Sequence, residues 1–369
     1  MAFPPFDRRT VLGVSIAALV PGFALTHTVV SRYRTSRERL ATEWSVRGHR
    51  DLAVAPEKAV VDFETALSYG PDRPDDRFEL AEALIQAREP VEARAQLLTL
   101  WAEQPGSGRI NLELARLAAA DGDVREAVRY YHGAVDGSWE SGASNARRAA
   151  RLEAAKLLLA HGERLRAQSE LIALIDDLPA DSALMTRIAG LLVDAGADLR
   201  ARTLLDRALT IDPQNRAAAR LAGTIAFRRG DYPAASSYFR TANASDADAT
   251  RMLAVSEAVL ALDPYSRGLS RAERATRAQH SLEAATDRLR RCETGAGSST
   301  TPSPFDDLDK RVAAARKLRA RTLARDPEAL DDVMALVFEI EKRPDAACGP
   351  PDARDRALLI LAERSGRPQ

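Results

Sequence analysis

Two cysteines are the residues of this chain whose chemistry is most readily defined. Only Cys292 and Cys348 carry a thiol among the 369 residues, and each follows a predicted helix in the C-terminal part of the chain. In a chain predicted below to be exported, two cysteines confined to one region favour a disulfide; the alternative is two unrelated buried thiols. Closing a loop of this length would stabilise the fold by about 4 kcal/mol in the chain-entropy model.

The histidines show no spacing that would build a metal or catalytic site. The five histidines are His27, His49, His132, His161 and His280, and no two of them lie at metal-ligand spacing. His132 follows two tyrosines on a predicted helix, where a surface or packing role is expected.

Other chemical motifs are equally incomplete. The stretch PGSGR at 105–109 lacks both the spacing and the lysine of a phosphate-binding loop. Paired carboxylates at Asp176–Asp177 and Asp331–Asp332 are typical of solvated helix ends. The sequence therefore predicts no catalytic residue, no metal, no cofactor and no small-molecule substrate.

Composition indicates the kind of elements that this chain forms. Hydrophobic residues make up 45% of it and aromatic residues only 5%, with alanine, leucine and arginine dominant. Strong helix formers with few β-branched or aromatic residues predict an all-α protein. The 53 basic and 53 acidic residues cancel, which argues against a general nucleic-acid binder.

Residues 10–30, after a short flank at 1–9, are predicted to meet a membrane. This stretch of 21 residues contains no Asp, Glu, Lys or Arg, and as a helix it would span about 31 Å. Pro21–Gly22 interrupts it and leaves an apolar run of signal-peptide length, and the preceding RRTVLG resembles a twin-arginine export signal. Because no good cleavage site follows, an uncleaved single-span anchor is favoured over a cleaved signal.

The two indications of membrane orientation disagree. Four arginines in the juxtamembrane segment 31–39 outnumber Arg8 and Arg9, which would keep the main domain in the cytoplasm. The signal-like layout of the N-terminus and the two cysteines favour a main domain on the extracytoplasmic side of the membrane. The expectation is a bacterial inner-membrane protein with a single span and a periplasmic main domain.

A period of 34 residues runs through the middle of the chain. Small, large and small apolar residues recur with steps of 34 and one step of 40, which places six additional residues after Trp139. The recurring triplets are Ala59, Phe63, Ala66; Ala93, Leu97, Leu100; Ala127, Tyr131, Ala134; Ala167, Leu171, Leu174; Ala201, Leu205, Ala208; and Ala235, Phe239, Ala242. Glycines that would end a helix precede four of them, at Gly122, Gly162, Gly196 and Gly230.

The first helix of each unit carries a matching small residue. These are Gly48, Ala81, Ala115, Ala155, Ala189 and Gly223. With this period and these positions the chain resembles the tetratricopeptide repeat (TPR) family. The resemblance implies a right-handed superhelical solenoid of six stacked helix-turn-helix repeats over 40–246. Because one helix pair cannot bury both of its faces, such pairs must stack.

The C-terminal part departs from the period. Residues 247–293 are expected to form capping helices, 294–305 a flexible linker, and 306–369 further C-terminal helices. A dimerisation role for this part is the alternative to a cap.

Partner binding is expected in the concave groove that first helices line in this family. The repeat positions carried over from the family are Phe78, Glu82, Ile85, Leu112, Arg116, Leu152, Lys156, Thr186, Val193, Arg220, Thr224, Phe227 and Arg228. Their mixture of apolar and basic side chains predicts a peptide with acidic and apolar residues. The family's carboxylate clamp of lysine and asparagine is not evident, and plain packing is the alternative for any one of these residues.

The leading functional hypothesis is a non-enzymatic, membrane-tethered scaffold that binds a peptide or helix of another protein. One alternative is an accessory component of an envelope assembly or polysaccharide export pathway. It would differ from the leading hypothesis in the protein that is bound and not in the way that protein is bound. A second alternative is an enzyme, whose required constellation of residues the sequence does not show. The predicted partners are a protein in the groove and a membrane at residues 10–30, without nucleic acid.

Overall fold

A computed structural model describes residues 8–140, 142–242, 246–295, 306–343 and 348–365, with side chains from Gly22 onward except at 294–295. The regular structure in these ranges is helical, apart from one isolated bridge between Ser107 and Ser138. The chain divides into two compact units, Met1–Leu174 and Ile175–Gln369. Among the described residues, the prediction of an all-α protein of stacked helix pairs is therefore confirmed.

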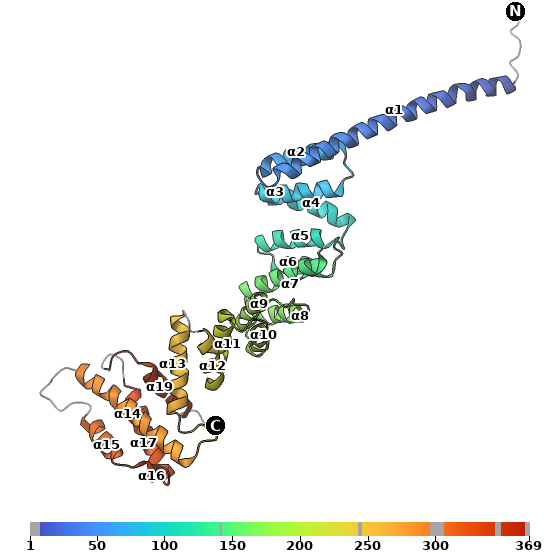
Figure 1. Cartoon of the computed structure of the whole chain (residues 1–369). Helices are drawn as coiled ribbons and strands as arrows, with labels where there is room; N and C mark the ends of the chain where they lie inside the picture. Colours follow the sequence, from blue (N-terminus) through green and yellow to red (C-terminus); the bar gives the residue numbers. More distant parts are fainter. Residues whose placement is uncertain (1–7, 141, 243–245, 296–305, 344–347, 366–369) are drawn as a thin grey trace, which may run out of the picture. The chain divides into compact units, whose positions relative to one another are not determined.

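The first unit is a succession of paired helices (Figure 1). Its helices are α1 (Arg8–Asp51), α2 (Pro56–Tyr69), α3 (Pro74–Gln86), α4 (Pro90–Glu103), α5 (Gly108–Ala120), α6 (Val124–Asp136), α7 (Ala143–Ala160) and α8 (Arg164–Ile175). Proline opens α2, α3 and α4, where its missing N–H costs no helical hydrogen bond. From α1 to α7 each helix packs on the next, and α2 to α7 share a continuous apolar core. Ala167 of α8 belongs to a smaller apolar cluster with Val128 and Leu158.

The predicted glycine breaks are turns within helix pairs. Gly122, which ends the first helix of its pair, has a φ of +79°, and Gly162 has a φ of +75°. This left-handed conformation suits a residue without a Cβ. Asp123 then caps α6, because its carboxylate accepts a hydrogen bond of 3.0 Å from the backbone N–H of Glu126. Arg88 occupies the equivalent turn between α3 and α4 with a φ of +65°.

The second unit begins with two more helix pairs and ends in a helical bundle (Figure 1). Its helices are α9 (Ser182–Asp194), α10 (Asp198–Ile211), α11 (Arg216–Arg228), α12 (Tyr232–Ala242), α13 (Ala247–Leu262), α14 (Arg271–Gly295), α15 (Asp306–Arg316), α16 (Ala320–Leu323), α17 (Pro327–Glu341) and α19 (Ala353–Ser365). Within this unit Gly196 and Gly230 form the same left-handed turns between paired helices.

The last helix of the chain takes part in the bundle in a non-sequential way. α13 packs extensively against α12 and α19, and only slightly against α14, which follows it in sequence. Val259 of α13, Leu289 of α14, Val337 of α17 and Leu358 of α19 belong to one apolar cluster. The helices that follow the repeats therefore share one core.

Helix α1 is continuous from Arg8 to Asp51, without a break at Pro21–Gly22. Its C-terminal end packs against α2 as the first helix of the first pair, whereas Phe23, Leu25 and Val29 are exposed. Within the residues that the structure describes, no helix is long and apolar enough to cross a membrane. The side chains of residues 10–21, more than half of the predicted span, are outside the described part of the structure, so the span stays a prediction.

Candidate protein-interaction surface

The residues predicted to line a groove in the first unit differ in accessibility. Phe78 and Leu112 are buried in the core, with 6% and 8% of their surface exposed, and offer little area to a ligand. Glu82, Ile85 and Leu152 are half-buried, and Arg116 and Lys156 are exposed. The accessible part of the predicted set is therefore mainly polar.

Arg116 is the centre of an ion-pair network that joins α5 to α7. Its Nε and Nη2 atoms donate to the two carboxylate oxygens of Glu153 at 3.0 and 2.7 Å. Its Nη1 atom donates to Glu113 at 2.6 Å, and the hydroxyl of Tyr131 donates to Glu153 at 3.3 Å. The guanidinium is thus already bound to two carboxylates of its own chain.

Burial and like charges raise the pKa values of acids on this face. Burial, followed by the carboxylates of Glu79 and Glu113, raises the pKa of Glu82 to about 7. Burial also raises the pKa of Glu113, against the lowering effect of Arg116. The pKa of Tyr131 rises through burial and the nearby charge of Glu153. Negative charge is therefore in excess around Glu82.

Sequence reasoning found Glu82 and Arg116 but missed Glu113 and Glu153. The signal was present, because Glu79, Glu113 and Glu153 are separated by the same steps of 34 and 40 that relate Glu82, Arg116 and Lys156. These six residues form two columns on successive first helices, α3, α5 and α7, and are called the first-helix face below. It carries four acidic and two basic side chains.

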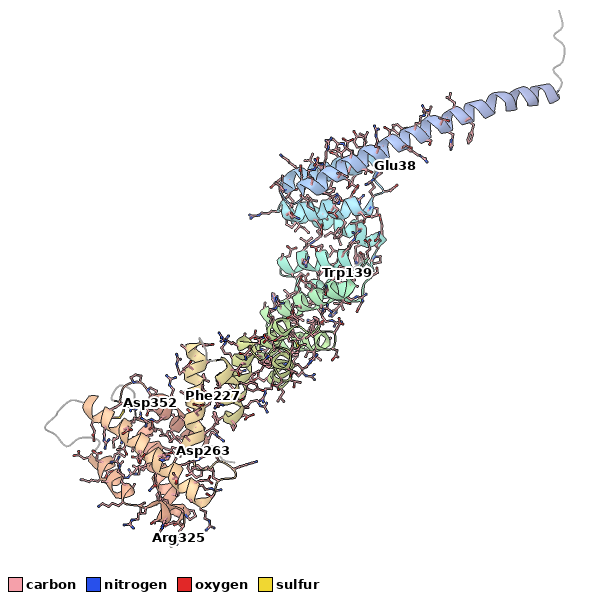
Figure 2. The ribbon with its side chains drawn as sticks, in the orientation of Figure 1. Glu38, Trp139, Phe227, Asp263, Arg325 and Asp352 are labelled. Carbon is pink, nitrogen blue, oxygen red and sulfur yellow. A yellow bond between two sulfur atoms is a disulfide. The ribbon has the colours of Figure 1, made fainter. Side chains whose placement is uncertain are left out.

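The groove residues predicted in the second unit are engaged within the chain. Arg220 lies 3.4 Å from Asp246, and Arg228 lies 3.2 Å from Asp198. Thr224 donates its hydroxyl to the carbonyl of Arg220 at 2.9 Å. Phe227 packs edge-to-face on the ring of Tyr232, with ring centroids 5.3 Å apart (Figure 2).

Thr186 and Val193, the remaining two predicted groove residues of the second unit, differ in their contacts. The hydroxyl of Thr186 donates to the carbonyl of Ser182 at 2.7 Å and accepts a bond from Asn215 at 3.1 Å. Val193 is half-buried. None of these contacts brings the predicted residues of this unit into one cluster, in contrast to the first-helix face.

The six additional residues after Trp139 were expected to form a loop, but α7 begins at Ala143, so the last three of them lengthen that helix. The short loop before α7 pairs with the loop before α5. The N–H of Gly108 donates to the carbonyl of Ser138, and that of Ser138 donates to the carbonyl of Gly106, both at 2.8 Å. A Cβ on Gly108 would collide with the indole of Trp139, whose Nε1–H donates to the carbonyl of Ala134 at 2.9 Å (Figure 2). A cavity of about 560 Å³ borders these loops. These hydrogen bonds pair the polar groups of the two loops with one another and so hold the loops in place.

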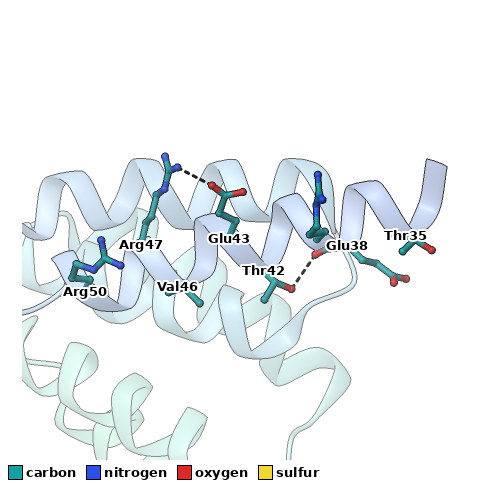
Figure 3. Close-up of a pocket in the computed structure, with 8 residues that line it drawn as sticks. Thr35, Glu38, Thr42, Glu43, Val46, Arg47 and Arg50 are labelled. Carbon is teal, nitrogen blue, oxygen red and sulfur yellow. Dashed lines mark hydrogen bonds and ion pairs between the residues drawn. The ribbon is translucent and has the colours of Figure 1, made fainter. Parts of the chain in front are cut away.

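A second, open hollow lies along the exposed side of α1 (Figure 3). It measures about 870 Å³ and is lined by Thr35, Glu38, Arg39, Thr42, Glu43, Val46, Arg47 and Arg50. Arg47 pairs with Glu43 at 2.9 Å, and the Thr42 hydroxyl donates to the carbonyl of Glu38 at 2.9 Å. All of the lining side chains come from one helix, and the polar contact that reaches them from a second element is the bond of 3.2 Å that Arg73 donates to the Thr42 hydroxyl.

His132 does not lie in a catalytic arrangement. Its Nε2 atom is 2.8 Å from Glu170, which also lies 3.5 Å from Arg151. No nucleophile accompanies this pair among the contacts of the described residues. Within the same residues, no three His, Cys, Asp or Glu side chains form a group that could hold a metal ion.

The predicted disulfide is present between Cys292 and Cys348, which are 56 positions apart. It lies beside a buried charged cluster, in which Arg288 is 3.4 Å from both Glu341 and Asp355. Arg291 pairs with Asp355 as well. Burial and the charge of Asp355 raise the pKa of Glu341 to about 8.

Comparison with solved structures gives remote similarities. Pseudomonas aeruginosa pilF is 19% identical, covering 57% of this chain and 90% of its own, with a TM-score of 0.38. YrrB, a TPR protein with an unusual peptide-binding site, is 14% identical over 49% and 90%, with a TM-score of 0.39. The C-terminal part of a TPR repeat-containing protein from Cytophaga hutchinsonii is 11% identical over 84% and 97%, with a TM-score of 0.44. TM-scores this low carry no functional argument.

Comparison with protein families is more direct. Curated protein sequences give no match. The tetratricopeptide repeat family model matches residues 55–117, which run from the start of α2 into α5. The turns, small residues and helix pairs described above recur beyond this segment in both units. Residues 55–117 are therefore similar to the tetratricopeptide repeat family, and the helix pairs outside this segment have the same helix-turn-helix form.

Proposed function

We propose that this chain is a non-enzymatic, membrane-tethered scaffold that binds a peptide or helix of a partner protein on its first-helix face. The observation that carries the proposal is the charged network of Glu82, Glu113, Arg116 and Glu153, built from three successive repeats. Repeat proteins of this kind bind extended partners along surfaces that span several repeats.

Charge on the first-helix face supports a basic client. The sequence alone predicted acidic partner residues, because it counted Arg116 as available. Arg116 is instead paired with Glu113 and Glu153, and burial, followed by the charges of Glu79 and Glu113, raises the pKa of Glu82 to about 7. A lysine or arginine of a client beside Glu82 would relieve this repulsion. Half-buried Ile85 and Leu152 would supply apolar contact.

The tether in this proposal is residues 10–30. Helix α1 continues from that segment into the first helix pair, so the repeats would be attached by a helix and not by a loose linker. The disulfide supports an oxidising compartment, and hence a periplasmic main domain at the inner membrane. The exposed apolar residues Phe23, Leu25 and Val29 are consistent with contact with lipid.

The experiment is client capture from membranes with the full chain. Glu82→Lys reverses the charge at the centre of the first-helix face, and Glu64→Lys makes the same change at an exposed site on α2. Cross-linking followed by mass spectrometry should recover a client with the wild type and with Glu64→Lys, and lose it with Glu82→Lys. Equal recovery by all three proteins, each shown to be folded by circular dichroism, would contradict binding at this face.

The same experiment addresses the alternative function. An accessory role in envelope assembly or polysaccharide export uses the same surface and differs only in the client recovered. Recovery of components of one such pathway by the wild type, and not by Glu82→Lys, would favour it.

A further inference from the structure

A ten-residue segment that runs from the end of α15 to α17 concentrates positive charge in a chain whose net charge is zero. Residues 316–325, called the basic loop below, contain five cations and no acidic residue. The cations are Arg316, Lys317, Arg319, Arg321 and Arg325, and all five are exposed. The segment comprises the end of α15, the short helix α16 and the turns that flank it.

The fold directs these charges outward by burying the apolar residues between them. Leu323 is buried in the bundle core, and Leu318 and Ala320 pack against it. The side chain of Gln279 on α14 donates to the carbonyl of Leu318 at 3.3 Å and anchors the loop. The apolar side of the segment therefore packs on the bundle, and the cations lie on its solvent-exposed side (Figure 2, Arg325).

The five cations lack partners in the part of the chain that the structure describes. No ion pair or side-chain hydrogen bond of any of them occurs there, whereas Arg311 on α15 lies 2.9 Å from Glu339. Residues 296–305, which precede α15 in the sequence, contain no aspartate or glutamate. Exposed like charges held close together repel one another, and an external polyanion relieves that repulsion.

A single-stranded nucleic acid and an acidic protein both fit the basic loop poorly. Phe338 is the only aromatic residue in 306–343 and is buried. The exposed ring of Tyr265 comes from outside the loop, and its hydroxyl donates to Asp331 of α17, so the basic loop itself carries no ring to stack on bases of a single strand. No large apolar side chain between residues 306 and 365 is exposed, in the described ranges, to form the apolar centre that a protein interface needs. Clustered arginines without an apolar pocket match a surface of phosphate groups.

We propose that the basic loop docks on the headgroups of an anionic phospholipid membrane. The contact is electrostatic and peripheral, made by guanidinium groups with lipid phosphates. It is separate from the first-helix face, and it does not depend on insertion of residues 10–30. A cluster of four to eight cations is of the size that binds anionic lipid surfaces, at about fivefold in affinity for each residue.

Hydrogen exchange of the full chain on vesicles tests this contact locally. The vesicles contain phosphatidylcholine alone or phosphatidylcholine with phosphatidylglycerol. Peptides covering 316–325 should be protected only with phosphatidylglycerol, and high salt should abolish the protection. Arg319→Gln/Arg321→Gln/Arg325→Gln should lose it, with binding weaker by roughly 100-fold. The control is Arg187→Gln/Arg200→Gln/Arg229→Gln, three exposed arginines elsewhere in the same unit, and should behave as wild type.

Three outcomes would overturn the proposal. These are protection on both kinds of vesicle, no protection on either, or protection that survives the triple substitution in the loop. Equal protection by inorganic phosphate without vesicles would identify a phosphate-ion site instead of a membrane contact. Flotation with pure phosphatidylcholine vesicles reports the N-terminal span separately, so failure of the tether is distinguishable from failure of the loop.

Discussion

The ring of Phe239 lies against Gly223, so closely that a Cβ on this glycine would be 2.8 Å from it. Within the first unit, Gly48 and Phe63 repeat the relationship at the same 2.8 Å. A small residue on the first helix thus makes room for the large residue on the second. This contact explains why the two positions recur together along the sequence.

Gly223→Ala should destabilise the second unit. The added methyl group gains helix propensity of about 1 kcal/mol but overpacks against a buried ring, which costs about 1–3 kcal/mol. Gly190→Ala on α9 is the matched control, since a Cβ there has no neighbour within 4 Å. It should be neutral or stabilising by up to about 1 kcal/mol. Urea unfolding of both variants measures the difference, and a Gly223→Ala protein as stable as Gly190→Ala would refute the packing argument.

Glu82 should make stability depend on pH in the direction opposite to that of a salt-bridged acid. Its pKa rises from 4.5 to about 7 on folding, through burial and the charges of Glu79 and Glu113, and despite Arg109 and Arg116. The folded state therefore holds the proton more tightly than the unfolded state. The contribution of Glu82 protonation to the free energy of unfolding is greatest below pH 4.5 and is lost as the pH rises through about 7.

Glu82→Gln removes that dependence. The variant should be more stable than the wild type at pH 8 and nearly equal to it at pH 4.5, as read from the difference in urea midpoints at each pH. Glu64→Gln, an exposed glutamate on α2, should leave the wild-type profile unchanged. If Glu82→Gln and the wild type lose stability in parallel between pH 5 and 8, the raised pKa is not a property of Glu82.

Local features of the sequence predicted local parts of the fold. Gly122 and Ala127 could be placed because a turn and a helix-packing position depend on residues a few places away. The pairing of α13 with α19 could not, since it joins segments separated by several helices. The burial of Arg288 could not be predicted from the sequence for the same reason. Its helix reads as a charged amphipathic one, and only the distant Glu341 and Asp355 explain why its guanidinium is fully buried.

The candidate surface was likewise predictable only in the features that depend on the repeat, and not in the contacts between helices. The period of the repeat placed Glu82 and Arg116 on first helices. It did not show that Arg116 would be taken up by Glu113 and Glu153, because ion pairing depends on side-chain geometry between helices. For that reason the client proposed for this face is basic, whereas the sequence alone predicted a client with acidic residues.

Removing Arg288 should cost much more than neutralising Glu341. Arg288→Met leaves Asp355 and Glu341 buried without their central cation, for which about 3–5 kcal/mol is expected. At pH 7 the Glu341 carboxyl, with a pKa of about 8, is mostly protonated, so Glu341→Gln should change stability by less than about 1 kcal/mol. Hydrogen exchange of peptides from α14 and α17 measures both effects locally. Equal losses would show that the cluster holds Glu341 ionised.

Reduction of the disulfide should loosen the attachment of α19 to the bundle. The bond joins the end of α14 to the segment before α19 and closes a loop with a sequence separation of 56. In the chain-entropy model this contributes about 4 kcal/mol by restricting the unfolded chain. Cys292→Ala/Cys348→Ala should therefore lower the unfolding midpoint of the second unit and increase hydrogen exchange in α19. Reductant should have the same effect on the wild type, after unfolding and refolding, and none on the double variant. A wild type whose midpoint is the same with and without reductant, although mass spectrometry shows both thiols free, would mean that packing of α19 against α13, α14 and α17 holds this end of the chain without the disulfide.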